Sequence, residues 1–277
     1  MKTNTSYIHE YDILDDINEC VNITIDSANS AYYSYEAALR HADLLGFFEN
    51  ASDSEVFMEK EKMGFFEKIG TAIINLIKKI TDAIKNFASR FQKKTEEIKT
   101  DQEIVSQILQ EHPDVKDEVC RGIKNEWFTY HDVAQYEKDI VGLCNMLEQH
   151  AIDHVTFKEK AAAALKKFAS NAQIIITAGT TLAAGIAVVP KIVNQYKAAK
   201  TSLESLKKDS EKKGKKWKAG SGYIGEAESN NVDPKTASLI ISEYSKAVSE
   251  ITKEQTNVLQ GYNVVDANLK AVANKYK

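Results

Sequence analysis

The chain has 277 residues, of which 43% are hydrophobic and 27% are charged, and its formal net charge is −4. This composition excludes an intrinsically disordered chain, and the length allows one large domain or two smaller ones. Only 3 prolines and 12 glycines are present, which leaves room for long helices because both residues interrupt them. We therefore expect an all-α fold, a bundle of long helices with a coiled-coil-like C-terminal helix.

The first predicted helix spans residues 7–45, where apolar residues recur at helical spacing. Residues 1–62 form an acidic segment with 4 Lys or Arg and 13 Asp or Glu, so the remaining chain is net basic. This charge split favours self-association or a separable segment, and the alternative is a solvated acidic helix. The segment lacks the apolar core of a signal peptide, so we expect no secretion by that route.

The most strongly patterned stretch is GFFEKIGTAIINLIKKITDAIKNFASRF, residues 64–91, within a helix predicted over 64–98. Apolar residues form one stripe, and the opposite face is basic and includes Lys78, Lys79, Lys85 and Arg90. A basic face opposite a Phe/Ile face suits a helix lying on a membrane. Core-facing helices show the same pattern and are commoner, so we expect Ile77 and Ile80 to face protein core.

Two further helices are predicted over 132–170 and 172–208. Residues 168–190 contain no charged residue, a length that reaches the transmembrane range of about 20 residues. Threonines, Asn171 and Gln173 dilute this stretch, so a buried central helix is the first interpretation. A membrane-inserting hairpin or a single span is the second.

Residues 207–218 carry seven lysines and are followed by glycine and serine. Such a run binds the phosphates of nucleic acid or anionic lipid, or it is a solvated linker. The glycines favour a linker over 207–232. The predicted division of the chain is therefore 1–62, 63–206, 207–232 and 233–277.

The last predicted helix, 234–275, begins with Asp233 as N-cap and Pro234 in the first position. Its apolar residues follow a near-heptad spacing, interrupted by Gln255. We expect this seam to lie in an intra-chain bundle or in a subunit interface; its members are Ile240, Tyr244, Val248, Ile251, Val258, Tyr262, Val265 and Leu269. If the seam packs internally, the basic faces must meet the partner instead.

No pattern in the sequence indicates catalysis. There is no glycine-rich phosphate loop, and nothing local pairs a nucleophile with a base. His150 and His154 have the i, i+4 spacing of metal ligands and could hold an ion together with Asp153, but two ordinary surface or core histidines are the commoner explanation. The three cysteines form no CxxC pair and suit a reducing interior. We therefore expect no enzyme activity, no cofactor and no small-molecule substrate.

Three features of the chain are similar to virion structural and internal proteins of large tailed bacteriophages. They are the acidic, tyrosine-bearing N-terminal segment, the loop that reaches Met58-Glu59 and Met63, and the helix GFFEKIGTAIINLIKKITDAIKNF. The resemblance implies a non-enzymatic virion component, made in the host cytoplasm, that assembles with other virion proteins or with itself. It names no binding residue.

A second resemblance competes with the first. Long helices that flank an apolar segment also look like the α-helical pore-forming toxins. This resemblance implies a membrane-acting helical protein, which is the alternative function. Contact with an anionic surface, either lipid or nucleic acid, would then use the lysine-rich stretches.

Overall fold

The computed structural model describes residues 29–30, 32–34, 36–37, 51–122, 128–220 and 232–276. Its elements, in chain order, are α2 (Ala51–Glu111), the short 3-10 helix η2 (Pro113–Asp117), β1 (Phe128–Tyr130), α3 (Val133–Glu148), α4 (His154–Ser170), β2 (Gln173–Ile176), α5 (Leu182–Gly220) and α6 (Pro234–Lys275). The all-α prediction is confirmed. Most of the helix predicted over 7–45 lies outside the described residues.

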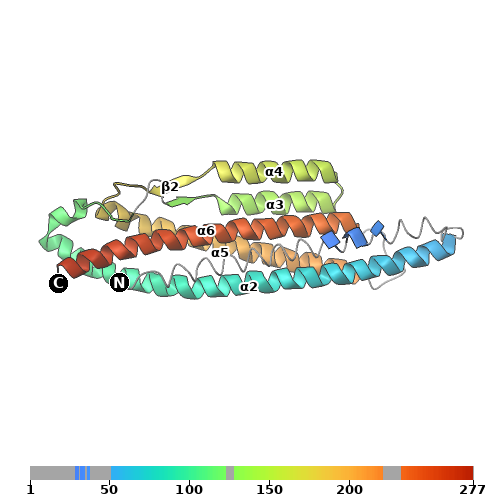
Figure 1. Ribbon diagram of the computed structural model, residues 1–277, viewed down its shortest axis with the longest axis horizontal. Coiled ribbons are helices and arrows are strands. Elements are labelled where there is room, and N and C mark those ends of the chain that lie inside the picture. Colours follow the sequence, from blue (N-terminus) through green and yellow to red (C-terminus); the bar gives the residue numbers. More distant parts are fainter. Residues whose placement is uncertain are drawn as a thin grey trace.

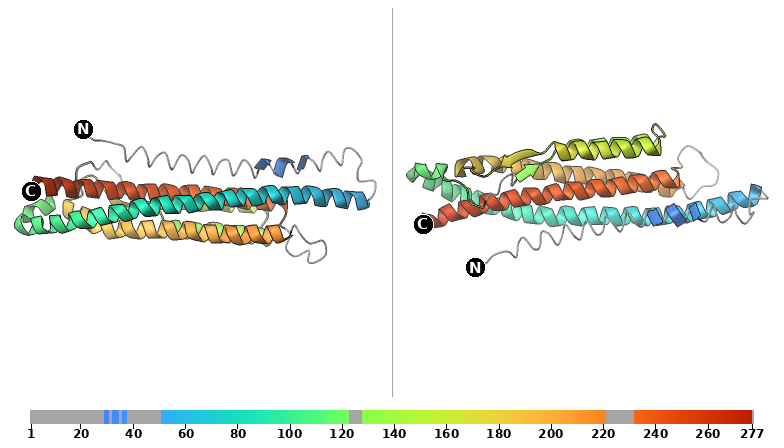
Figure 2. Two further views of the ribbon diagram at one scale, coloured as in Figure 1. Left: turned by 90° about the horizontal axis from the view of Figure 1, so that it is seen from below. Right: turned by 45° about the horizontal axis from the view of Figure 1, so that its top comes forward.

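The three longest helices, α2, α5 and α6, lie side by side and give the molecule its elongated shape (Figure 1). Each of the three packs against the other two. The α3–α4 hairpin lies along one side of this bundle, with α3 against α5 and α6 and with α4 on the outer side of α3 (Figure 2). The helices are long because each keeps an apolar stripe at helical spacing over many turns.

Two hydrophobic clusters fill the bundle, one toward each end. One gathers Ile80, Leu203 and Ile251, and the other is built around Phe91. Phe91 stacks on Tyr196 at 3.7 Å between ring centroids and on Tyr262 at 4.8 Å. These rings join α2, α5 and α6 in one layer, so the same set of three helices is held together at both ends.

Gln255 lies on α6 between the two clusters. Its side chain is fully buried, and neither its Nε2 nor its Oε1 has a hydrogen-bond partner among the described residues. The interruption seen in the seam is therefore a polar group placed in the middle of an apolar bundle. Burial of an unpaired amide lowers the stability of the folded state.

The prediction of one helix over 132–170 is wrong. The chain turns back after α3, where His150 adopts a positive φ of 56°, and α4 begins at His154. The side chain of Asp153 accepts a hydrogen bond of 2.7 Å from the backbone N–H of Thr156 and so caps the new helix. The reversal lets Phe157 and Phe168 of α4 reach the core, which a straight helix would not allow.

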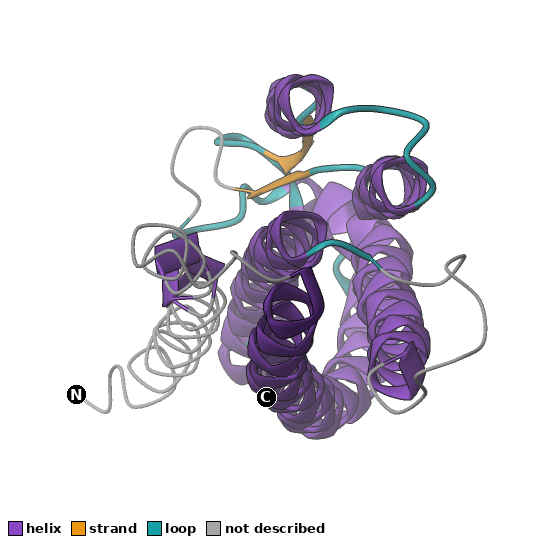
Figure 3. Ribbon diagram, turned by 90° about the vertical axis from the view of Figure 1, so that its right-hand side faces the viewer, coloured by secondary structure: helices purple, strands orange, loops and turns teal. Residues whose placement is uncertain are grey.

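The prediction of a helix over 172–208 is also wrong at both ends. Residues 173–176 form β2, which pairs antiparallel with β1, with Thr129 opposite Ile174 (Figure 3). Three consecutive isoleucines favour a strand because β-branched side chains suit extended backbone. Gly179, with a φ of 91°, lies in the turn before α5.

The boundaries of α2 and α5 revise the predicted segments. Helix α5 continues to Gly220, so residues 207–220 are helical and do not belong to a linker. Helix α2 begins at Ala51 and extends to Glu111, beyond both ends of the predicted 64–98. The boundary expected between residues 62 and 63 therefore falls inside a helix. The coiled-coil character of α6 stays a prediction.

Candidate functional site

The seam of α6 is buried inside this chain. Its eight predicted residues are each between 0 and 3% exposed; they are Ile240, Tyr244, Val248, Ile251, Val258, Tyr262, Val265 and Leu269. They belong to the two clusters that also contain residues of α2 and α5. The seam is therefore an intra-chain packing surface, and a second chain cannot reach it without opening the bundle.

The apolar stripe of the amphipathic stretch also faces the core. Ile80 is 1% exposed, and the half-buried Ile77 packs against the same cluster. Both predictions are confirmed. On the opposite face, Lys78 and Lys85 are exposed and Arg90 is partly buried, while the side chain of Lys79 is outside the described part.

Part of the lysine run on α5 is neutralised within the chain. Lys213 is 4% exposed and lies 2.6 Å from Oε2 of Glu148, at the end of α3. Lys216 lies 3.0 Å from the other oxygen of Glu148, to which the indole N–H of Trp217 also donates. Burial opposes ionisation of Glu148, but the hydrogen bonds and charges of the two lysines outweigh it and lower its pKa. The ion pairs of these two lysines with Glu148 connect α5 with α3.

Of the remaining lysines of this run, Lys208, Lys212 and Lys215 are exposed, and Lys207 is half-buried and lies 3.8 Å from Glu211. The side chain of Lys218 is outside the described part. These lysines lie on a helix that packs directly against α2. The closeness of the two helices is clearest at Gly214, where an added Cβ would be 3.1 Å from Cγ2 of Ile73. The two lysine-rich stretches, far apart in the sequence, thus lie on neighbouring helices.

We call this the basic surface and define it by Lys78, Lys85, Lys208, Lys212 and Lys215. Two of these lysines lie on α2 and three on α5. Asp82, between the two lysines of α2, is exposed as well, so the surface is mixed in charge with a basic excess. Exposed lysines of this kind attract carboxylates or phosphates, with a strength that falls as salt rises.

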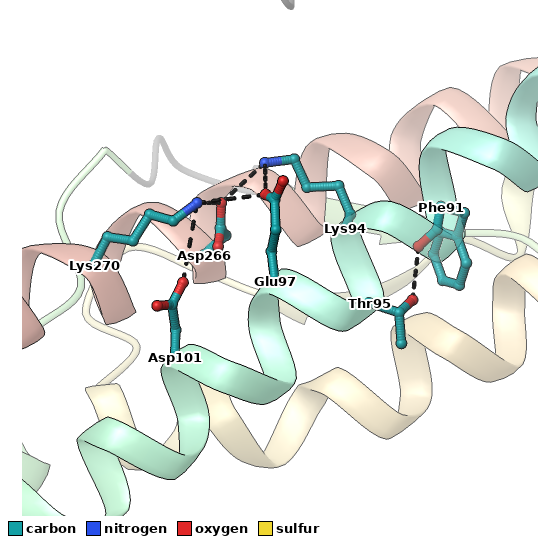
Figure 4. Close-up of polar contacts among 7 residues, drawn as sticks. All are labelled: Phe91, Lys94, Thr95, Glu97, Asp101, Asp266 and Lys270. Carbon is teal, nitrogen blue, oxygen red and sulfur yellow. Dashed lines mark hydrogen bonds and ion pairs between the residues drawn. The ribbon is translucent and has the colours of Figure 1, made fainter.

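A second cluster of charged side chains connects α2 with α6 (Figure 4). Asp266 of α6 is 4% exposed and lies 3.0 Å from Nζ of Lys94 and 2.9 Å from Nζ of Lys270. The same lysines approach Glu97 at 3.0 and 3.5 Å, and Lys270 lies 4.0 Å from Asp101. Burial raises the pKa of Asp101. Lysines occupy the space between the carboxylates, so the group acts as an interhelical ion network.

The histidine pair does not form a metal site. His150 is exposed in the turn that precedes α4, so it does not share a helix face with His154. Nε2 of His154 lies 2.9 Å from the hydroxyl of Thr236 and 3.8 Å from Oδ1 of Asp233. Within the described ranges, no cluster of His, Cys, Asp or Glu side chains is suited to hold a metal ion.

The charge-free stretch 168–190 is not a buried central helix, and this prediction is corrected. It contains the end of α4, β2, a turn and the first residues of α5. Ile174 of β2 is 52% exposed, and several alanines of the stretch are exposed as well. Among the helices that the structure describes, none has both the length and the apolar character needed to cross a bilayer.

A further polar contact that the sequence reasoning missed joins His131 to Glu254. His131, between β1 and α3, places Nδ1 2.6 Å from Oε1 of Glu254, and its backbone N–H donates to Oε2 at 3.1 Å. Burial raises the pKa of Glu254, although hydrogen bonds from His131 oppose the shift. The partners are 123 residues apart, so no local pattern could have indicated this link between the hairpin and α6.

Comparison with known protein families, with curated protein sequences and with solved structures gave no match.

Proposed function

We propose that this protein is a non-enzymatic structural component of a bacteriophage virion that binds neighbouring subunits through its basic surface. The observation that carries the proposal is the distribution of side chains on an elongated bundle. The apolar stripes of α2 and α6 are used for packing within the chain, whereas the lysines of α2 and α5 point outward. The resemblance of the α2 stretch to virion proteins supports the assignment.

The chemistry of the basic surface favours an acidic protein partner. Its lysines lie along two packed helices, so an extended partner could contact several of them together. Individual exposed ion pairs are weak, about 0.2–1 kcal/mol each, so stable binding needs several contacts at once. Binding should therefore weaken steeply as salt increases.

The direct test is to purify particles from infected cells and identify their proteins by peptide mass spectrometry. We expect peptides of this chain in washed particles, and fewer of them after a high-salt wash. Detection of the chain only in the membrane fraction or the medium would refute the virion assignment.

A matched pair of variants tests the surface itself. Lys78→Glu with Lys85→Glu reverses two charges of the basic surface, whereas Lys158→Glu with Lys166→Glu makes the same change of net charge on α4. We expect only the first pair to reduce incorporation into particles. Equal incorporation of both variants would show that the basic surface does not bind the partner.

A second candidate function is contact with a membrane. The observation in its favour is the exposure of Ile174 in a stretch that has no charged residue. Flotation with liposomes tests it, with Ile174→Asp as the variant. Binding to liposomes that the variant abolishes would favour this function, and absence of the wild-type protein from floated liposomes would exclude it.

A further inference from the structure

An open groove of about 430 Å³ runs between α3 and α4. Gly142, Leu143 and Met146 of α3 form one side of its floor, and Ala163 and Ala164 of α4 form the other. These residues are small or apolar, and Met146 is 37% exposed. The groove therefore presents an apolar floor between two helices, on the outer hairpin of the molecule.

The packing of this chain does not require a small residue at Gly142. Among the residues that the structure describes, a Cβ built at this position meets no atom within 4 Å, and the φ of Gly142 is not in the left-handed region. The space above the residue is open. A helix backbone can approach such a floor closely because no large side chain stands in the way.

Lysines border the groove. Lys138 and Lys160 are exposed, and Lys167 lies 3.6 Å from Oδ2 of Asp139 on the opposite helix. With three lysines and one aspartate, the lining has a net positive charge. A matching occupant must bring an apolar stripe with carboxylates beside it.

The acidic segment of this chain has that character. No Lys or Arg occurs between Lys2 and Arg40. Tyr11, Leu14, Ile17 and Val21 are spaced by three, three and four residues, which as a helix makes a stripe about 15 Å long. On α3 the groove extends from residue 138 to residue 146, a helical rise of about 12 Å. The two lengths agree.

Carboxylates lie at the N-terminal end of this stripe and along one flank of it. Glu10 lies one helical turn before Leu14, and Asp15 lies one turn after Tyr11. In a docked helix these two carboxylates would be the nearest ones to the lysines at the border of the groove. The charges of segment and groove are therefore complementary as well as their apolar parts.

We propose that residues 10–21 of a second copy of this chain bind as an amphipathic helix in the groove between α3 and α4. Two copies that exchange these segments make the contact twice, and each contact raises the effective concentration for the other. The same pairing without mutual exchange gives an open chain of copies. Both arrangements appear as self-association of the purified protein, independently of any virion.

The experiment is sedimentation velocity of the full chain over a wide range of protein concentration. We expect the wild type to self-associate, and Lys138→Glu with Lys160→Glu to raise the dissociation constant about tenfold or more, because attraction is replaced by repulsion. Lys158→Glu with Lys166→Glu, on the same α4 helix but outside the groove, is the matched control and should leave the constant unchanged.

A charge swap makes the test specific. Glu10→Lys with Asp15→Lys should weaken self-association by itself, and should restore it when combined with the two groove reversals. A wild type that stays monomeric overturns the proposal, and so does self-association that both lysine pairs affect equally. Because no particle is needed, these outcomes are independent of the virion assignment.

Discussion

Substitution of Ile80 by aspartate tests whether the amphipathic stretch of α2 belongs to the core or to a membrane surface. Ile80 is 1% exposed and lies in the cluster that also contains Leu203 and Ile251. Ile74, on the same helix, is 62% exposed. The pair Ile80→Asp and Ile74→Asp therefore introduces the same chemistry into two different environments within two turns of one helix.

The expected loss at Ile80 has two parts. Loss of a buried isoleucine side chain costs about 2–5 kcal/mol, as in large-to-small core substitutions. The new carboxyl must also lose its charge to stay buried, and holding an aspartic acid neutral at pH 7 against a reference pKa of about 3.9 costs roughly 4 kcal/mol. The sum is comparable with the whole stability of a typical domain, about 5–15 kcal/mol.

Urea unfolding followed by circular dichroism measures these free energies. We expect Ile80→Asp to lose most of the stability at pH 7, Ile80→Ala to lose only the first part, and Ile74→Asp to change stability by less than about 0.5 kcal/mol. Lowering the pH toward 4 should narrow the gap between Ile80→Asp and Ile80→Ala. If Ile80→Asp unfolds like the wild type but no longer binds liposomes, the core assignment is wrong.

Three further outcomes follow from buried polar groups. Gln255→Leu should raise the unfolding free energy by about 1–3 kcal/mol, because the unpaired amide is removed. The control Gln260→Leu, at a half-buried position of α6, should change the unfolding free energy little. A lower unfolding free energy for Gln255→Leu would show that the fold needs the amide. The pKa of Glu148 is lowered by its lysines, so its contribution to stability is present above the ordinary carboxyl value of 4.5 and is lost as pH falls through the lowered value. Glu148→Gln should flatten that acid dependence, and an unchanged pH profile would contradict the pairing with Lys213. Asp233→Ala should cost about 0.5–2 kcal/mol, because it removes the N-cap of α6, and thermal unfolding checks it.

The sequence alone determined the helical character of the chain and the starts of two helices, α3 and α6. Asp132 and Asp233 accept hydrogen bonds from the backbone N–H groups three residues on, as N-caps do. The stripe of α2 and the seam of α6 face the core along most of their described length. These features were predictable because apolar spacing and capping are properties of a few neighbouring residues.

The candidate site was predictable only in part. Lys78 and Lys85 are exposed as expected, and the seam, which the sequence placed either in an intra-chain bundle or in a subunit interface, is buried in the chain. An intra-chain bundle and a subunit interface both satisfy the same 3/4 spacing. An apolar stripe must be buried, but its spacing does not say whether the same chain or a second chain covers it. Only the packing of α2, α5 and α6 decided this.

The tertiary structure also decided where the chain reverses and which lysines stay free. The β1–β2 pair joins residues more than 40 positions apart, as in the contact of Tyr130 with Gln173, and the reversal after α3 places α4 against α3. Lys213 is buried because Glu148 on another helix neutralises it, whereas Lys212, its neighbour, is exposed. Adjacent lysines look alike in a sequence. Packing of the helices fixes which neighbouring helix each lysine faces and which charge it meets there.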